Sequence, residues 1–171
     1  VGSGRIGRAT ARRIEAFGVP VVYHNRRQVE GESRRWYPDL VEMARDVDTL
    51  VSVAPGGAST HHMIGKAVLE ALGPTGILIN IGRGSVVDEA ALAEALDAGT
   101  IWSAGFDGFE TEPCLPKALM THDRVVLLPH VGSASHHTRD LMGQLVVDNL
   151  ATWFAEGKPL TPVAETPWPR R

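Results

Sequence analysis

The chain has 171 residues, of which 43% are hydrophobic and 22% are charged, and its formal net charge is −3. This length allows one domain with a good core, and the ordinary composition excludes a disordered or fibrous protein. The slightly acidic balance argues against nucleic acid and anionic membranes as partners, because both are bound by concentrated Lys and Arg.

The first predicted elements are a helix and a strand that follow a glycine-rich loop. The loop VGSGRIG (residues 1–7) leads into residues 5–17, whose apolar positions recur at helical spacing and which end before Gly18. The β-branched run at residues 19–23 predicts a short strand. Loop, helix and strand follow in the order of a βαβ unit, but only Val1 remains of its first strand, which we therefore expect to be largely missing.

Four further apolar runs lack polar alternation, which is typical of strands covered on both faces, and they lie at residues 49–54, 76–81, 100–106 and 124–129. Helical stretches lie between these runs, the clearest at residues 88–99, and a long amphipathic stretch covers residues 136–154. Strands that alternate with helices predict an α/β fold with a Rossmann-type, doubly wound parallel sheet.

The glycine loop matches the G-x-G-x-x-G pattern of dinucleotide-binding folds, with Gly2, Gly4 and Gly7 at its three positions. The first glycine permits a tight turn, the second lets backbone approach a pyrophosphate, and the third lets helix pack against strand. Unpaired N–H groups at the start of the helix would then attract the anion. The alternative is a glycine turn of purely structural use. The helix and strand that follow favour the dinucleotide site.

The stretch YHNRR favours NADP(H) over NAD(H). An NAD site usually places an acid about 20 residues after the loop, where it binds the ribose hydroxyls. This chain instead has Asn25, which can donate a hydrogen bond to a 2′-phosphate, and Arg26 or Arg27 can bind the phosphate through charge-assisted hydrogen bonds. The alternative is a pair of solvated surface arginines.

Three residues that follow predicted strands have the chemistry of a hydride-transfer site. Arg83 lies in INIGRGSVVDE, Glu112 in FDGFETEP and His130 in LPHVGSAS. The carboxyl ends of strands form the ligand crevice of an open α/β sheet, so we expect these side chains to converge on the nicotinamide. Histidine suits proton transfer at neutral pH, a nearby carboxylate would hold its ring, and arginine clamps a substrate carboxylate. Taken singly, each residue is more often structural or solvated.

Together these motifs resemble the D-isomer-specific 2-hydroxyacid dehydrogenases, over their coenzyme-binding domain. The similarity covers nearly the whole chain, and Arg83, Glu112 before a proline and His130 after a proline match the family's catalytic Arg, Glu and His. The resemblance implies reduction of a 2-oxoacid such as glyoxylate or hydroxypyruvate to the D-2-hydroxyacid. In that reaction Arg83 orients the substrate, His130 delivers the proton and Glu112 aligns His130. YHNRR resembles the NADPH-preferring glyoxylate and hydroxypyruvate reductases.

The resemblance also implies further contacts to the cofactor. Asp107 would hold the nicotinamide carboxamide, and the PGG of residues 55–57 would line the adenine side. The predicted cofactor-binding residues are Gly2, Gly4, Arg5, Ile6, Gly7, Asn25, Arg26, Arg27, Ala54, Pro55, Ile81, Gly82, Asp107 and Gly132.

Two departures from the family pattern affect the expected organisation. Gly108 stands where the family usually has a larger apolar residue, which loosens the backbone before Glu112. The segment that builds most of the substrate domain in this family would precede the glycine loop, so we expect an N-terminally truncated chain. We assign residues 1–157 to the NAD(P)-binding domain and residues 158–171 to an irregular tail, and the resemblance implies a homodimer for the full-length enzyme.

The remaining residues with possible chemistry are adjacent histidines and one cysteine. His61 and His62, like His136 and His137, are adjacent, and neighbours on a helix or strand do not face one ligand, so no metal is expected. The single cysteine, Cys114, lacks the context of a nucleophile and cannot form an internal disulfide. The lack of an internal disulfide, of a signal segment and of a long apolar run together favours a cytoplasmic protein. A non-catalytic NADP(H)-binding module or redox regulator and a non-functional remnant with exposed sheet edges remain as alternatives.

Overall fold

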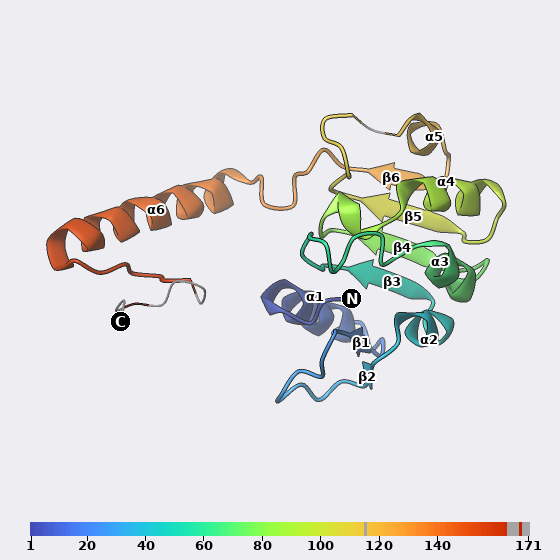
Figure 1. Ribbon diagram of the computed structural model, residues 1–171, viewed down its shortest axis with the longest axis horizontal. Coiled ribbons are helices and arrows are strands. Elements are labelled where there is room, and N and C mark those ends of the chain that lie inside the picture. The colour runs from blue at the N-terminus through green and yellow to red at the C-terminus, as the bar shows by residue number, and fades with distance from the viewer. Residues whose placement is uncertain (115, 164–167, 169–171) are drawn as a thin grey trace. The chain divides into compact units, whose positions relative to one another are not determined.

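Parallel strands and their connecting helices form one of two compact units, Val1–His130, and a long helix forms most of the other, Val131–Arg171 (Figure 1). The computed structural model describes residues 1–114, 116–163 and 168. Each unit is described by itself below. Among the described residues, no helix is both long enough and apolar enough to cross a bilayer.

Two parallel sheets carry the fold of the first unit. The larger sheet contains, in this order, β3 (Thr49–Ser52), β4 (Ile77–Asn80), β5 (Ser103–Phe106) and β6 (Val125–Leu127). The smaller sheet pairs β1 (Tyr23–His24) with β2 (Trp36–Tyr37). In the larger sheet Leu50 is in register with Leu78, and Leu78 with Ala104, and all three are buried. These parallel ladders confirm the predicted α/β fold.

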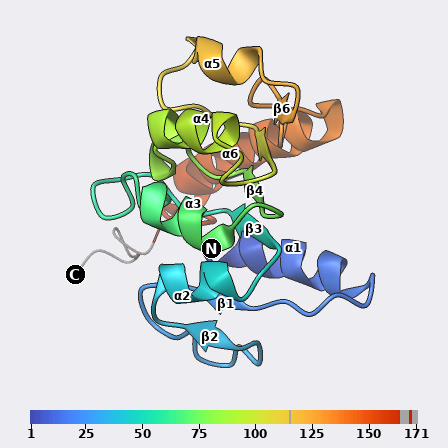
Figure 2. The same ribbon diagram turned by 90° about the vertical axis from the view of Figure 1, so that its right-hand side faces the viewer.

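Most helices of the first unit begin at a capping side chain or beside a glycine, whereas α5 follows Pro116. They are α1 (Arg5–Glu15), α2 (Leu40–Arg45), α3 (Lys66–Leu72), η1 (Gly84–Val86), α4 (Glu89–Asp97) and α5 (Lys117–Met120). The Asp39 carboxylate accepts the N–H of Glu42 at the start of α2, and Asp88 accepts the N–H of Ala91 at the start of α4. Helix α2 packs on α3 and α3 on α4, a row along one face of the sheet (Figure 2).

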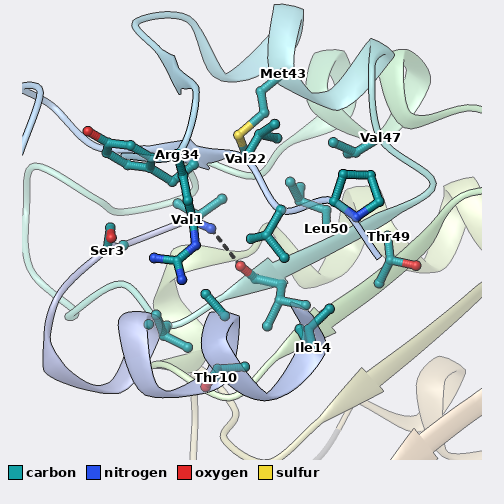
Figure 3. Close-up of a pocket in the computed structure, with 18 of the residues that line it drawn as sticks. Val1, Ser3, Thr10, Ile14, Val22, Arg34, Met43, Val47, Thr49 and Leu50 are labelled. Carbon is teal, nitrogen blue, oxygen red and sulfur yellow. Dashed lines mark hydrogen bonds between the residues drawn. The ribbon is translucent and has the colours of Figure 1, made fainter. Parts of the chain in front are cut away.

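A cavity of about 540 Å³ separates the two sheets, and we call it the strand slot (Figure 3). It is lined by apolar residues of α1, of residues 19–23, of α2 and of β3, among them Ile14, Val22, Met43 and Leu50. At its end the Val1 amino group donates to Val51 O at 2.6 Å, Val53 N donates to Val1 O, and Gly2 N donates to His24 O. Val1 and Gly2 therefore hydrogen-bond to both β1 and β3, between the two sheets.

The prediction of a strand at residues 19–23 is wrong for most of that run, because only Tyr23 lies in a strand. The run borders the strand slot, where backbone of a neighbouring strand would supply its hydrogen-bond partners. Conversely, β2 was not predicted. Its two residues are too few for a visible alternation, and they are fixed by pairing with β1.

The second unit consists mainly of α6 (His136–Glu156), which was predicted at residues 136–154. Ser135 caps its first turn by accepting the N–H of Thr138, and Gly157 ends it in the left-handed conformation with φ 67°. None of its residues is buried in the single chain, and its exposed large apolar residues include Leu141, Leu145, Leu150 and Phe154. The division into compact units falls after His130, so the domain boundary expected at residue 157 stays a prediction, and part of the tail assigned to residues 158–171 lies outside the described residues.

Candidate active site

The glycine loop has the shape that a dinucleotide requires. Gly2 has φ 89°, which an L side chain rarely adopts, and a Cβ on Gly7 would lie 2.1 Å from Gly2 O. Gly4 has open space around its Cβ position, and it precedes α1 without any side-chain cap. The first N–H groups of α1 are therefore available to an anion, so the residues present fit a pyrophosphate.

Side chains behind the loop fix its position, and sequence reasoning missed two of them. Ser3 N–H donates to Asn25 Oδ1 at 2.7 Å, and the Ser3 hydroxyl donates to Glu32 Oε2 at 3.1 Å. Arg34 binds Glu32 and also forms a two-point ion pair with Glu15 at the end of α1. Ser3 and Glu32 carry no motif, because the contact joins residues 29 positions apart.

Asn25, Arg26 and Arg27 lie directly after β1, at the carboxyl end of that strand. Asn25 uses its side-chain oxygen to accept the Ser3 N–H, which directs its Nδ2 donors toward another acceptor. Arg26 and Arg27 are exposed, and neither forms an ion pair with any residue in the described part of the chain. Two unneutralised guanidinium groups beside an amide donor are a suitable environment for a phosphate.

The residues predicted from the next strands lie at adjacent strand ends. Ala54 and Pro55 follow β3, and Ile81 and Gly82 follow β4. A Cβ on Gly82 would lie 2.6 Å from Ala54 O, so the backbones of these two loops are in contact. Ile81 is 42% exposed, and Ile6 at the start of α1 is 66% exposed. Both are available to contact a planar apolar ligand.

Arg83 is positioned by the buried amide of Asn80, the last residue of β4. Asn80 Nδ2 donates to Arg83 O at 3.0 Å, and Asn80 Oδ1 accepts the N–H of Gly82 at 3.2 Å. Because Asn80 is fully buried, these bonds fix the turn from which the exposed Arg83 side chain extends. The N-x-G-R-G pattern is visible in the sequence, but it does not predict that Asn80 positions Arg83.

Glu112 and His130 form a hydrogen-bonded pair. His130 Nδ1 lies 3.0 Å from both Oε1 and Oε2 of Glu112, and Phe109 N–H donates to Oε1. The hydrogen bond from the Phe109 N–H lowers the pKa of Glu112 most, and the hydrogen bond with His130 lowers it further, so the carboxylate stays ionised at neutral pH. His130 adopts φ 54°, a left-handed conformation uncommon for a non-glycine residue.

The loop of Arg83 and the loop of Glu112 are in direct contact. A Cβ on Gly84 would lie 1.8 Å from the carbonyl carbon of Phe109, so only glycine allows this approach. Gly108 does not prevent the Glu112 pair from forming, and a Cβ there would be 3.5 Å from Glu112 Oε1, an ordinary contact. A cavity of about 240 Å³ is lined by Phe109, Glu112, Pro113, Leu127, Leu128, Pro129 and His130.

Two predicted cofactor residues differ in their surroundings. Asp107 follows β5 directly, is 7% exposed, and donates its N–H to Asn80 O. It therefore lies beside the turn that holds Arg83. Gly132 belongs to the second unit, Val131–Arg171. The first unit thus brings together the glycine loop, Asp107 and the three predicted catalytic residues along one set of strand ends.

The histidine pair His61–His62 contradicts the geometric reason given for excluding a metal. The two residues lie in a turn rather than in a helix or strand, and their rings stack with centroids 3.8 Å apart. Both Nε2 atoms lie within 3.1 Å of Glu110 Oε1. Adjacent histidines here do face one partner, which the sequence did not indicate.

Comparison with known proteins decides the family. Residues 1–132 match the model of the D-isomer specific 2-hydroxyacid dehydrogenase, NAD binding domain. The chain belongs to this family. The match includes the glycine loop, the turn of Arg83, the Glu112–His130 pair and Gly132. The Rossmann-type fold predicted from the sequence is thereby confirmed.

Relatives of this dehydrogenase domain include several reductases. The chain is 48% identical over 164 residues to hydroxyphenylpyruvate reductase of Plectranthus scutellarioides and 45% identical over 163 residues to a glyoxylate/hydroxypyruvate reductase of Arabidopsis thaliana. Each alignment covers 95% of this chain and 52% of the relative. The chain therefore spans about half the length of the curated relatives it matches.

A solved structure of the family superposes closely. It is the NADPH-dependent glyoxylate/hydroxypyruvate reductase of Sinorhizobium meliloti in complex with NADP and malonate. The TM-score is 0.94 at 58% sequence identity, and the comparison covers 99% of this chain and 53% of that one. At this identity and TM-score, the dehydrogenase domain has the fold of the corresponding half of that reductase.

Proposed function

We propose that this dehydrogenase domain binds NADP(H) and carries the catalytic residues that reduce a small 2-oxoacid, such as glyoxylate or hydroxypyruvate, to the D-2-hydroxyacid. The observation that carries the proposal is the Glu112–His130 pair, in which Nδ1 lies 3.0 Å from both carboxylate oxygens. The similarity to glyoxylate/hydroxypyruvate reductases supports this class of substrate. When bound, the nicotinamide supplies the hydride.

The Glu112–His130 pair is suited to deliver the proton. With Nδ1–H donating to the ionised Glu112, the ring is held in one orientation, and Nε2–H is left to donate to the carbonyl oxygen that becomes the hydroxyl. The depressed pKa of Glu112 keeps it an acceptor rather than a competing acid, because the Phe109 N–H and His130 both stabilise its charge.

Arg83 is suited to bind the substrate and polarise its carbonyl. Its guanidinium is exposed, while Asn80 and Gly84 fix its backbone against the loop of Glu112. A guanidinium binds a carboxylate in bidentate fashion, which sets the orientation of a 2-oxoacid. The 240 Å³ cavity beside Glu112 and His130 is mostly apolar and has room for a short substrate chain.

The test of this function is a titration of the purified chain with NADPH and NADH, followed by nicotinamide fluorescence, with glyoxylate and hydroxypyruvate turnover measured on the same sample. Binding with turnover that is lost in His130→Gln supports the full proposal. Binding without turnover supports only a cofactor-binding module. If neither nucleotide binds to a chain whose circular dichroism shows a cooperative melt, the proposal is wrong.

Preference for NADPH should depend on Arg26 and Arg27. Changing both to alanine should weaken NADPH binding roughly 100-fold or more, because each charge-assisted bond to a 2′-phosphate contributes about 1.5–3 kcal/mol. NADH binding should change little. The matched control is Arg12→Ala with Arg13→Ala, which removes the same charge from the last turn of α1. An equal loss of NADH and NADPH affinity in the Arg26 and Arg27 variant would contradict the assigned role.

We also propose that the full-length enzyme is a homodimer and that α6 contributes to the interface. Its exposed residues include Leu141, Leu145, Leu150 and Phe154, which would bury apolar area against a second copy. Sedimentation of the chain and of a Leu145→Glu, Leu150→Glu variant measures this directly. If the chain and the variant sediment with the same mass, α6 does not form the interface.

A further inference from the structure

A cluster outside the proposed catalytic residues joins two loops of the first unit. His61 and His62 lie in the loop between β3 and α3, and Glu110 lies in the loop between β5 and α5. His61 Nε2 is 3.0 Å from Glu110 Oε1, and His62 Nε2 is 3.1 Å from Oε1 and 3.0 Å from Oε2. In the part of the chain that the structure describes, this is the set of His, Cys and acidic groups whose ligand atoms all lie within 4.8 Å of one another.

Backbone geometry holds the two imidazoles together. His62 adopts φ 50°, and this left-handed step brings its ring over that of His61 with the ring planes 20° apart. His62 N–H donates to Ser85 O at 2.8 Å, and Ile64 N–H donates to Val86 O at 3.0 Å, so the turn is anchored on η1. The backbone of this turn therefore places the two rings together, so their position does not depend only on the rotamers of exposed side chains.

Glu110 is held from its other side. Its N–H donates to Glu89 Oε1 at 2.8 Å, which fixes the backbone that presents the carboxylate to the two rings. The His62 side chain, and to a smaller extent that of His61, keeps the pKa of Glu110 below its usual value, so the carboxylate is ionised near neutral pH. The histidines also have Asp88 nearby, with Oδ2 3.9 Å from His62 Nδ1.

We propose that His61, His62 and Glu110 form a three-ligand site for Zn²⁺. Imidazole nitrogen and carboxylate oxygen bind Zn²⁺ at about 2.0–2.2 Å, which in a tetrahedron separates two ligand atoms by about 3.3–3.5 Å. The observed 3.0 and 3.1 Å between each Nε2 and Oε1 are a few tenths of an ångström shorter. The ion replaces the protons that now bridge the nitrogens and the carboxylate, and both rings must turn out of their stacked arrangement so that the two Nε2 lone pairs meet at the ion.

The surroundings favour a divalent cation over an anion. The described acidic side chains near the rings are Glu110, Asp88 and Glu89, and the ligand histidines are neutral when they bind a metal. Asp88 is placed to accept a hydrogen bond from His62 Nδ1–H once the ring turns, as outer carboxylates commonly do for metal-bound histidine. Because the cluster is at the surface, water completes the fourth position.

The experiment titrates the purified chain with Zn²⁺ by calorimetry and with Co²⁺ by visible absorption, using Mg²⁺ as the hard cation that the site should not bind. One ion per chain is expected, with tetrahedral Co²⁺ bands and a rise in melting temperature on adding Zn²⁺. His61→Gln and His62→Asn should each lower the affinity at least about 10-fold. Asparagine is chosen at residue 62 because it tolerates the left-handed backbone.

The matched control changes the other adjacent pair, His136 and His137. These begin α6, where neighbours point about 100° apart, so replacing both with Gln should leave Zn²⁺ affinity unchanged. Cys114→Ser should also leave it unchanged. The site is refuted if Zn²⁺ does not bind to the folded chain, if binding survives the combined His61 and His62 variant, or if it is lost with His136 and His137. Circular dichroism of each variant tests whether the fold is retained. None of these readouts depends on the proposed reductase function.

Discussion

The free energy of unfolding of the chain with a free Val1 amine should rise by roughly 3 kcal/mol between pH 5 and pH 8, which is most of the full effect of its buried amine. Burial beside the strand slot lowers the pKa of the Val1 amine from 8.0 to about 5. A difference of about three pH units corresponds to roughly 4 kcal/mol, at 1.36 kcal/mol for each unit. Val1 as a residue is only partly buried, but its amino group is enclosed where it donates to Val51 O.

The sign follows from where the proton binds. Above pH 8 the amine is neutral in both states and imposes no cost. Between pH 8 and pH 5 the unfolded chain binds a proton that the folded chain does not, so each step toward lower pH destabilises the fold. Below about pH 5 the folded chain also carries the charge, and the full penalty is present.

The measurement is urea unfolding at half-unit steps from pH 5 to pH 8, on the free and the N-acetylated chain. Acetylation keeps one N–H for Val51 O and removes the charge, so the difference between the two curves isolates the amine from every carboxylate and histidine. An apolar strand added before Val1 should remove the same slope and also fill part of the slot. Parallel curves for the free and acetylated chains would show that the amine is not the cause.

Gly84→Ala should destabilise the first unit by about 3 kcal/mol or more, which lowers the melting temperature by roughly 6–12 °C. The new Cβ would lie 1.8 Å from the carbonyl carbon of Phe109 and 2.1 Å from the N atom of Glu110. Both neighbours are backbone atoms, so no side-chain rotation can relieve the overlap. The loop from Phe109 to Glu112 must move away from Arg83, and the Glu112–His130 hydrogen bonds should weaken with it.

The control for this variant is Gly143→Ala. Gly143 lies inside α6, and a Cβ there meets no atom within 4 Å, so the change should stabilise the helix by about 0.5–1 kcal/mol. Thermal melts followed by circular dichroism compare the two substitutions directly. A Gly84→Ala protein that melts within 2 °C of the parent, with turnover or NADPH binding unchanged, would mean that the two loops are not in the close contact described.

Local patterns predicted most of the larger sheet and the positions of the candidate site. The runs that became β3 to β6 are mainly apolar, and that pattern depends on nearby residues only, although the coverage on both faces that it predicts does not hold for β6, where Val126 is 62% exposed. Arg83, Glu112 and His130 could then be placed near one another, because parallel strands present their carboxyl ends at the same edge. Placing these residues requires only the order and direction of the strands, and the alternation of strands with helices predicts both.

What the sequence did not predict depends on contacts between distant residues. Residues 19–22 read as a strand, but a strand needs a partner, and the strand slot lies beside them. The convergence of His61 and His62 on Glu110 needs a left-handed step at His62 and a loop 48 residues away. Likewise the Ser3–Glu32 bond and the hold of Asn80 on the Arg83 turn have no spacing signal of their own.

The exposed thiol of Cys114 makes the Glu112 loop observable on its own. It is the single cysteine of the chain and lies two residues after Glu112. A maleimide fluorophore or a spin label would therefore attach at one position without any background substitution. Its emission or mobility would report whether this loop moves when a nucleotide or a 2-oxoacid is added, independently of any absorbance from the nicotinamide. The chain thus carries its own attachment point for following the Glu112 loop in time.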